Sequence, residues 1–315
     1  AYGQIQLLHV FAVGLLIFAA FISGFKANAT GLYVAAGTTL GVDGDGVVTI
    51  DGDLTEIDGT LQLTTATSMF TSNGLTIDGD MAGSNAGSTV KLSGGTLTGT
   101  SAVSILGNLT LTGAVTLGQN VTVAGTVTLG TNLLTLNAKT LTLSSSATTA
   151  ITATSGTGGV VGGSTALTSK LAWAIGSTNG TYKFPFANAT GVDVAVTVVT
   201  DEAADIGTVT VATYATSDVN SPYPGGGITH TSGLGRTSAV DRFWKVERSS
   251  GTNTPSVTVT YAPDEADAMT NETDIRIQSA NTATDVWNAA VVGQSSDAGA
   301  NTITFPNFDQ FALPI

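Results

Sequence analysis

Residues 107–132 repeat a six-residue phrase four times, and this repeat constrains the fold more than any other feature of the chain. In each unit two aliphatic residues flank a threonine, as in Leu109-Thr110-Leu111. Because successive side chains of a β-strand point to opposite faces, the two aliphatic side chains share one face and the threonine takes the other. Glycine, asparagine and alanine between the units suit tight corners. The phrase is therefore typical of a β-solenoid, in which each short strand stacks on its equivalent one coil away.

Similar short strands separated by glycine, asparagine or aspartate precede the repeat, so the sequence predicts a β-solenoid-like repeat region over residues 30–153. A meander of antiparallel hairpins is the alternative, because two-residue corners also allow hairpins. The number of strands in one coil stays open, since the spacing of the leucines slips after Asn132.

The repeat uses almost no charge, and only 10% of the whole chain is charged. A charge at a repeated position would face its like at the strand spacing of about 4.8 Å, whereas stacked threonines can satisfy one another. No acidic residue lies between Asp80 and Asp193. The net charge of −13 argues against nucleic acid or an anionic membrane surface as a partner. The absence of cysteine excludes disulfides and thiolate chemistry, and with the apolar N-terminus it suits an exported bacterial protein.

Residues 5–22, IQLLHVFAVGLLIFAAFI, are almost all apolar and would span about 27 Å as a helix, close to the thickness of a bilayer core. One interpretation is a secretory signal peptide cleaved after Ala27-Asn28-Ala29. The other is a retained hydrophobic α-helix over residues 1–29, which we favour because no basic residue precedes the run. This helix would be membrane-resident before it assembles with other copies. Its assembly residues would be Ile5, Leu7, Leu8, Val10, Phe11, Leu15, Phe18, Phe21 and Ile22. Residues 1–25 resemble the N-terminus of the type IV pilin family, in which such a helix packs against its copies in the core of a fibre, although Ile5 stands where bacterial pilins carry glutamate.

A Gly/Ser/Thr-rich break at residues 154–166 predicts a linker, followed by a C-terminal domain over residues 167–315. Runs of alternating residues with no amphipathic helix between them predict that this domain is an antiparallel β-sandwich. Its predicted core aromatic residues are Phe184, Phe186, Phe243, Trp244, Trp287, Phe305 and Phe311. The chain as a whole is thus predicted to be mainly β, with an N-terminal hydrophobic α-helix, a β-solenoid-like middle and a C-terminal sandwich.

The second half of the chain carries four short motifs that contain aromatic residues. They are YKFPF (182–186), DRFWKVE (241–247), DVWNAAV (285–291) and ITFPNFDQFALPI (303–315). Residues 165–315 resemble the terminal domain of large repeat-containing surface proteins of Bacteroidota. In that family a repetitive β region leads into a sandwich, often followed by a sorting domain of the type IX secretion system. The resemblance implies a secreted, surface-exposed structural or adhesive protein and transfers no catalytic residue.

Candidate binding residues are few. Aspartates at alternate positions suggest calcium ligands, namely Asp43, Asp45, Asp51, Asp53, Asp78 and Asp80. The same Asp-Gly pairs are common in tight turns, which is the simpler interpretation. Trp244 and Trp287 are possible stacking residues for a glycan, although Trp244 lies in a charged segment where salt bridges are the ordinary explanation. Calcium is the one metal or cofactor that the sequence suggests. No nucleophile–base pair, nucleotide motif or zinc motif appears in the sequence, so we do not expect an enzyme.

These observations favour a structural subunit of an extracellular bacterial filament at the cell surface. It would self-assemble through the hydrophobic N-terminal helix, through pairing of β-strand edges, or through both. The alternative is a membrane-anchored or secreted surface adhesin, whose β-sandwich binds a glycan or a receptor. A polysaccharide lyase or hydrolase on a solenoid is disfavoured, because residues 81–169 contain no carboxylate side chain and two lysines.

Overall fold

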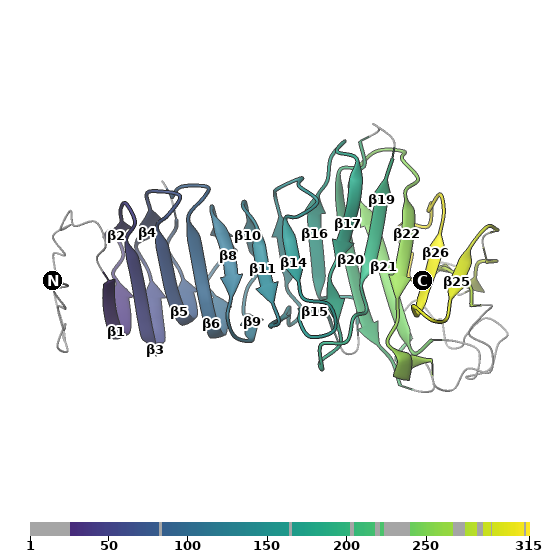
Figure 1. Cartoon of the computed structure of the whole chain (residues 1–315), viewed down its shortest axis with the longest axis horizontal. Coiled ribbons are helices and arrows are strands. Elements are labelled where there is room, and N and C mark those ends of the chain that lie inside the picture. The colour runs from purple at the N-terminus through teal and green to yellow at the C-terminus, as the bar shows by residue number, and fades with distance from the viewer. Residues whose placement is uncertain are drawn as a thin grey trace.

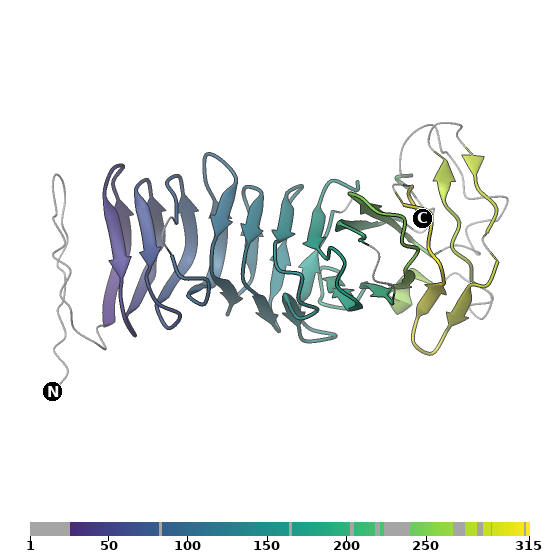
Figure 2. The same cartoon turned by 90° about the horizontal axis from the view of Figure 1, so that it is seen from above.

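The structure is a computed structural model, and it is mainly β (Figure 1). It describes residues 26–81, 84–163, 166–201, 205–217, 221–223, 240–266, 275–281, 286–290, 292–311 and 313–315. The coils stack in a row along the long axis, and the C-terminal sheets lie at the far end of that row (Figures 1 and 2). Apart from the 3₁₀ turn η2 (Pro263–Glu265), every helix or strand within these residues is a β-strand.

The N-terminal part is a β-solenoid of about six turns. One long strand spans two adjoining sides of each early coil: β1 (Lys26–Val34), β3 (Val47–Ile57), β5 (Met69–Ile77) and β6 (Thr89–Thr98). Two short strands replace it in the later coils: β8 (Asn108–Leu111) with β9 (Val115–Leu117), β11 (Val127–Gly130) with β12 (Leu133–Thr135), and β14 (Ile151–Ala153) with β15 (Gly159–Val161). The third side holds β2 (Thr39–Val42), β4 (Thr60–Leu63), β7 (Val103–Ile105), β10 (Val121–Val123), β13 (Thr140–Leu143) and β16 (Lys170–Ala174).

All strand pairs between successive coils are parallel. The predicted β-solenoid is therefore confirmed, and the antiparallel meander is wrong.

The six-residue phrase corresponds to one side of a three-sided coil. Its first three units form β8, β9 and β10, and its fourth unit begins the next coil as β11, whose Val127 pairs with Leu109. The paired aliphatic residues of all four units point inward and are at most 3% exposed: Leu109, Leu111, Val115, Leu117, Val121, Val123, Val127 and Leu129. Coils need not keep this length, because Val47 pairs with Met69 and Val127 pairs with Ile151 in the same sheet. Longer corners accommodate the additional residues.

Asparagine and glycine at the corners fix one coil against the next. Asn108 donates from Nδ2 to the carbonyl oxygen of Gly87 at 3.0 Å and accepts from the backbone N–H of Thr126 at 2.8 Å, so it contacts the coils on both sides. Gly79 lies directly against the preceding corner, where a Cβ atom would come within 1.6 Å of the carbonyl oxygen of Gly59. Such close stacking explains why these corners use glycine.

One side of the solenoid continues directly into the C-terminal sheets. The solenoid strand β16 pairs antiparallel with β20 (Thr208–Ala215), which pairs with β21 (Arg242–Arg248). A second, antiparallel sheet has the order β17 (Gly180–Phe184), β19 (Val196–Thr200), β22 (Ser256–Thr260), β26 (Thr302–Phe305) and β25 (Ser295–Asp297). Shorter strands are β18 (Phe186–Ala187), β23 (Ala280–Asn281) and β24 (Val286–Trp287).

The two C-terminal sheets face each other across an aromatic core. The ring of Trp173 on β16 lies 5.2 Å from that of Tyr182 and 5.4 Å from that of Phe184, both on β17. All three side chains are fully buried. One of the two sheets is therefore mixed rather than antiparallel, because it is the continuation of a solenoid side.

The predicted N-terminal α-helix is not supported and has to be corrected. The described residues contain no α-helix, and none of their helices is long and apolar enough to cross a membrane. Residues 26–29, assigned to that helix, instead begin the strand β1. The alternating polar and small residues of this segment suit a strand better than an apolar helix. The predicted assembly residues between Ile5 and Ile22 lie outside the described residues.

The predicted linker at residues 154–166 contains the strand β15. This strand pairs with β12 on one side and with β18 on the other, so a sheet runs across the segment. Its glycines fit the close packing of neighbouring strands, since a Cβ atom at Gly159 would lie 2.7 Å from the carbonyl oxygen of Pro185.

Candidate functional sites

The predicted calcium ligands lie at separate places along the solenoid. Asp43 sits in a turn and accepts hydrogen bonds from the Thr64 hydroxyl at 2.5 Å and from the Gly44 backbone N–H at 2.8 Å. These two bonds hold the pKa of Asp43 below its ordinary value. Asp80 forms a backbone bridge with Thr60. Asp45 lies in the same turn as Asp43, while the side chains of Asp51 and Asp53 fall outside the described part of the structure.

Glu56, Asp58 and Asp78 form an acidic cluster on neighbouring coils, with one carboxylate oxygen of each within 4.8 Å of the others. The Tyr33 hydroxyl donates to Asp58 at 2.7 Å, and this hydrogen bond raises the pKa of Tyr33. The backbone N–H of Thr100 donates to Asp78 at 2.5 Å. Three carboxylates at this spacing are chemically suited to Ca²⁺. Of the predicted ligands this cluster includes Asp78 alone.

The sequence interpretation missed Glu56 and Asp58. A signal was available, because Asp58-Gly59 and Asp78-Gly79 are the same dipeptide one coil apart. The stacking of these corners could be recognised only once the coil length was known, since Ile57 pairs with Ile77 in the neighbouring strand.

The structure places the two candidate glycan-stacking tryptophans in different environments. Trp244 points between the sheets and is 4% exposed. Trp287 is half-buried and stacks on Phe243 with a ring separation of 6.0 Å and an interplanar angle of 22°. The Tyr223 ring lies 6.3 Å from Phe243 on the same aromatic cluster. Trp287, rather than Trp244, is therefore the tryptophan that a ligand can reach.

Charged side chains of β21 are paired, as the salt-bridge interpretation predicts. Arg242 forms a buried, bidentate ion pair with Glu265, with nitrogen–oxygen distances of 2.5–3.0 Å. On the other face, Glu247 accepts from Lys245 at 2.7 Å and from Lys170 at 3.1 Å. Partial burial opposes ionisation of Glu247, but the two lysines outweigh it and lower its pKa.

Ser155, Lys183 and Asp193 bring a hydroxyl, an ammonium group and a carboxylate together. Ser155 Oγ donates to Asp193 at 2.5 Å, Lys183 Nζ does so at 3.1 Å, and the backbone N–H of Gly156 does so at 3.2 Å. Partial burial alone would raise the pKa of Asp193, but these donors together lower it. The lowered pKa makes this carboxylate a weak base, and its three donors join the segment around Ser155 to Lys183.

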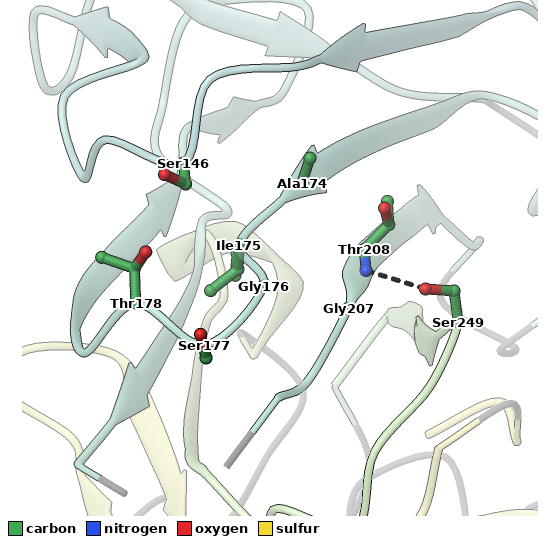
Figure 3. Close-up of a pocket in the computed structure, with 9 residues that line it drawn as sticks. All are labelled: Ser146, Ala174, Ile175, Gly176, Ser177, Thr178, Gly207, Thr208 and Ser249. Carbon is green, nitrogen blue, oxygen red and sulfur yellow. Dashed lines mark hydrogen bonds between the residues drawn. The ribbon is translucent and has the colours of Figure 1, made fainter. Parts of the chain in front are cut away.

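An open pocket of about 430 Å³ lies where the solenoid meets the C-terminal sheets (Figure 3). We call it the hydroxyl pocket. It is lined by Ser146, Ala174, Ile175, Gly176, Ser177, Thr178, Gly207, Thr208 and Ser249. Ser146 and Thr178 lie on one side of it, and Thr208 and Ser249 on the other (Figure 3). Its lining carries five hydroxyl side chains and no charged or aromatic side chain.

The two ends of the stacked sheets differ in how their edges are covered. Among the described residues, β1 pairs with β3 alone, so its outer edge has no strand partner there. At the other end, the outer edge of β21 is covered by the C-terminal segment, since Trp244 and Ile315 exchange two backbone hydrogen bonds of 2.8 Å. Unpaired edges are templates for pairing with other chains. The edge of β1 is thus a candidate assembly surface, and β17 and β25 likewise have one strand partner each among the described residues.

Comparisons with protein-family models, with curated proteins and with solved structures gave no match to this chain.

Proposed function

We propose that the chain is a structural subunit of an extracellular bacterial filament, in which the outer edge of β1 in one copy contacts a different surface of the next copy. Two β1 edges paired with each other would close as a dimer and could not extend a filament. The observation that carries this proposal is the parallel stack of coils that ends, among the described residues, in a strand without an outer partner. The same backbone geometry that holds each coil to the next is presented at that edge to another chain.

Backbone directions in β1 support the proposal. The carbonyl oxygen of Val34 accepts from the backbone N–H groups of Asp58 at 2.8 Å and Gly59 at 3.0 Å, so Val34 faces β3. Successive residues of a strand direct their backbone polar groups to opposite edges. The N–H and C=O groups of Tyr33 therefore face outward, where an added strand would bond to them.

Apolar side chains of the solenoid interior also lie in the first coil, which contains β1 and β2. Val34 and Val42 are 7% and 4% exposed, while Leu32 and Leu40 are partly buried against the same core. A strand that paired with β1 would cover the remaining exposed surface of Leu32 and Val34, which belong to that strand. Each square ångström of apolar surface removed from water stabilises the contact by about 25 cal/mol.

Charge opposes the approach of another copy to this end. Residues 26–80 contain eight acidic residues and one lysine, and the whole chain carries a net charge of −13. Repulsion between copies is screened beyond about 8 Å at physiological salt but extends to about 30 Å at 0.01 M salt. Association through β1 should therefore strengthen as salt is added.

The test is sedimentation velocity with negative-stain electron microscopy of the full chain at about 0.01 M and about 0.15 M salt, conditions chosen for their different screening lengths. Tyr33→Pro removes an outward N–H that no described residue uses, and proline is tolerated in edge strands at such positions. Tyr33→Thr is the matched control, because it loses the same ring and hydroxyl contact but keeps the N–H. We expect the wild type and Tyr33→Thr to form filaments and Tyr33→Pro to stay monomeric.

Equal melting temperatures of the two variants would show that the proline is accommodated in the fold. A wild-type chain that remains monomeric, or that stops at a dimer, at both salt concentrations contradicts the proposal. So does a folded Tyr33→Pro variant that assembles like the control.

A second candidate function is a surface adhesin, and the half-buried Trp287 favours it. A tryptophan held against Phe243 at the surface offers a rigid ring on which a glycan could stack. Glycan binding that disappears in Trp287→Ala, in a chain that forms no filaments, would support adhesion over assembly.

A further inference from the structure

We propose that the hydroxyl pocket binds an uncharged saccharide. This inference is independent of association through β1. It gives the adhesin alternative a binding site that includes neither Trp244 nor Trp287. Trp287 stacks on Phe243 in β21, whereas the pocket residue Ser249 follows the end of β21, six residues later. Six residues of extended strand place Trp287 about 20 Å from the pocket.

The lining excludes several ligand classes. The nine residues of the pocket include no lysine, arginine or histidine to hold an anion and no carboxylate to hold a cation. Its volume of about 430 Å³ falls within the usual range of small-molecule sites, roughly 300–1,000 Å³. A ligand that fits this lining is small, neutral and rich in hydrogen-bonding groups.

Four of the lining hydroxyls are available to such a ligand. Within the described part of the chain, the side-chain hydroxyls of Ser146, Ser177, Thr178 and Thr208 have no hydrogen-bond partner. Ser249 differs, because its Oγ accepts from the backbone N–H of Thr208 at 2.8 Å (Figure 3). A hydroxyl is both donor and acceptor, which matches the dual character of the hydroxyl groups of a sugar.

Buried aromatic side chains hold the walls of the pocket in place. The Tyr182 hydroxyl lies 3.1 Å from the carbonyl oxygen of Ser146 and 3.0 Å from that of Thr178 and shares its one hydrogen between them, so one buried ring joins two lining segments. The Trp173 indole N–H donates to the carbonyl oxygen of Ser145 at 2.9 Å. Because these walls are fixed before binding, a ligand pays less to order them.

The backbone at Gly176, one of the lining residues, is also held in place. Gly176 donates its N–H to Gly207 at 2.9 Å and accepts from the N–H of Ile206 at 2.9 Å, which joins two turns back to back. Gly176 has a φ of +64°, and a Cβ atom there would meet nothing within 4 Å. A sugar ring can therefore approach the backbone at this point without meeting a side chain.

Isothermal titration of the full chain with cellopentaose, maltopentaose and xylopentaose tests the proposal, with pentagalacturonate as a charged comparison. The key variant is Thr178→Val/Thr208→Val, which removes two unpartnered hydroxyls and keeps the side-chain shape. Thr128→Val on the exposed face of β11 is the matched control. Ser177→Trp, at an exposed position of the lining, fills the pocket as a second and independent variant.

We expect saturable binding of at least one uncharged probe, weakened about tenfold in the double variant by the loss of two hydrogen bonds. Ser177→Trp should abolish this binding, while Thr128→Val and Trp287→Ala should leave it unchanged. Absence of saturable binding to all three uncharged probes overturns the proposal. Unchanged affinity in the folded pocket variants, loss of binding in Trp287→Ala, or preference for pentagalacturonate would overturn it as well. None of these results depends on whether the chain forms filaments.

Discussion

The corner stack at Gly79 gives the sharpest test of the solenoid itself. A methyl group at this position would lie 1.6 Å from the carbonyl oxygen of Gly59, whereas Cβ atoms essentially never approach other atoms closer than 3.0 Å. Gly79 does not have a positive φ, so the close approach alone requires glycine. Gly41, in β2, has a Cβ position with nothing within 4 Å and serves as the matched control.

The expected cost follows from the bonds that the methyl group would separate. Asp80 donates its N–H to the carbonyl oxygen of Gly59 at 3.1 Å, and Gly79 donates to Ile57 at 2.8 Å. Losing such bonds costs about 1 kcal/mol each, and forcing extra volume into a packed site adds about 1–3 kcal/mol. Gly79→Ala should therefore reduce the free energy of unfolding by about 3–5 kcal/mol and the melting temperature by roughly 10 °C. Gly41→Ala should change the stability by less than about 1 kcal/mol.

Urea unfolding followed by circular dichroism measures the difference, and hydrogen exchange locates it. Protection should fall first in β3, β4 and β5, on either side of the corner. If Gly79→Ala unfolds within about 0.5 kcal/mol of Gly41→Ala, the two corners are not stacked as described, and the register of the early coils is wrong.

Two further predictions concern charged groups. Asp193 and Glu247 both have lowered pKa values when folded, so the unfolded chain binds their protons at higher pH than the folded chain does. Their stabilising effect is complete above about pH 4–5 and is lost as the pH falls through their folded pKa values, so the melting temperature should drop on acidification and drop less in Asp193→Asn. Removing one member of the buried pair in Glu265→Ala leaves Arg242 buried without its carboxylate, which should cost about 3–5 kcal/mol in urea unfolding. A cost below about 1 kcal/mol would contradict the burial of this pair.

The sequence predicted features that depend on neighbouring residues better than features that depend on contacts between distant parts of the chain. The side on which each residue of a strand points depends only on its neighbours in the sequence. The inward-facing residues of the repeat, from Leu109 to Leu129, were therefore predicted correctly. The number of strands in a coil is a long-range property, because it depends on which unit stacks on which. The pairing of Leu109 with Val127 shows that three units close one coil. A repeat of four units read by itself cannot distinguish this from other closures.

The candidate sites were harder to predict because they join residues from different coils. Asp58 and Asp78 meet only through stacking, and the hydroxyl pocket combines segments around Ser146, Gly176 and Gly207 that share no sequence motif. Trp244 and Trp287 look equivalent in the sequence. Alternation along β21 directs Trp244 between the sheets, while the short strand β24 carries Trp287 to the surface.

The continuation of one solenoid side into antiparallel strands has a consequence for the length of the molecule. The C-terminal part pairs with the last coil through β15 and β16, and the far end presents the first coil through β1. Whole units of three six-residue phrases could be gained or lost between them, each altering the rod by one strand spacing of about 4.8 Å. The length of the rod would then change in fixed steps, while the residues exposed at its two ends stayed the same.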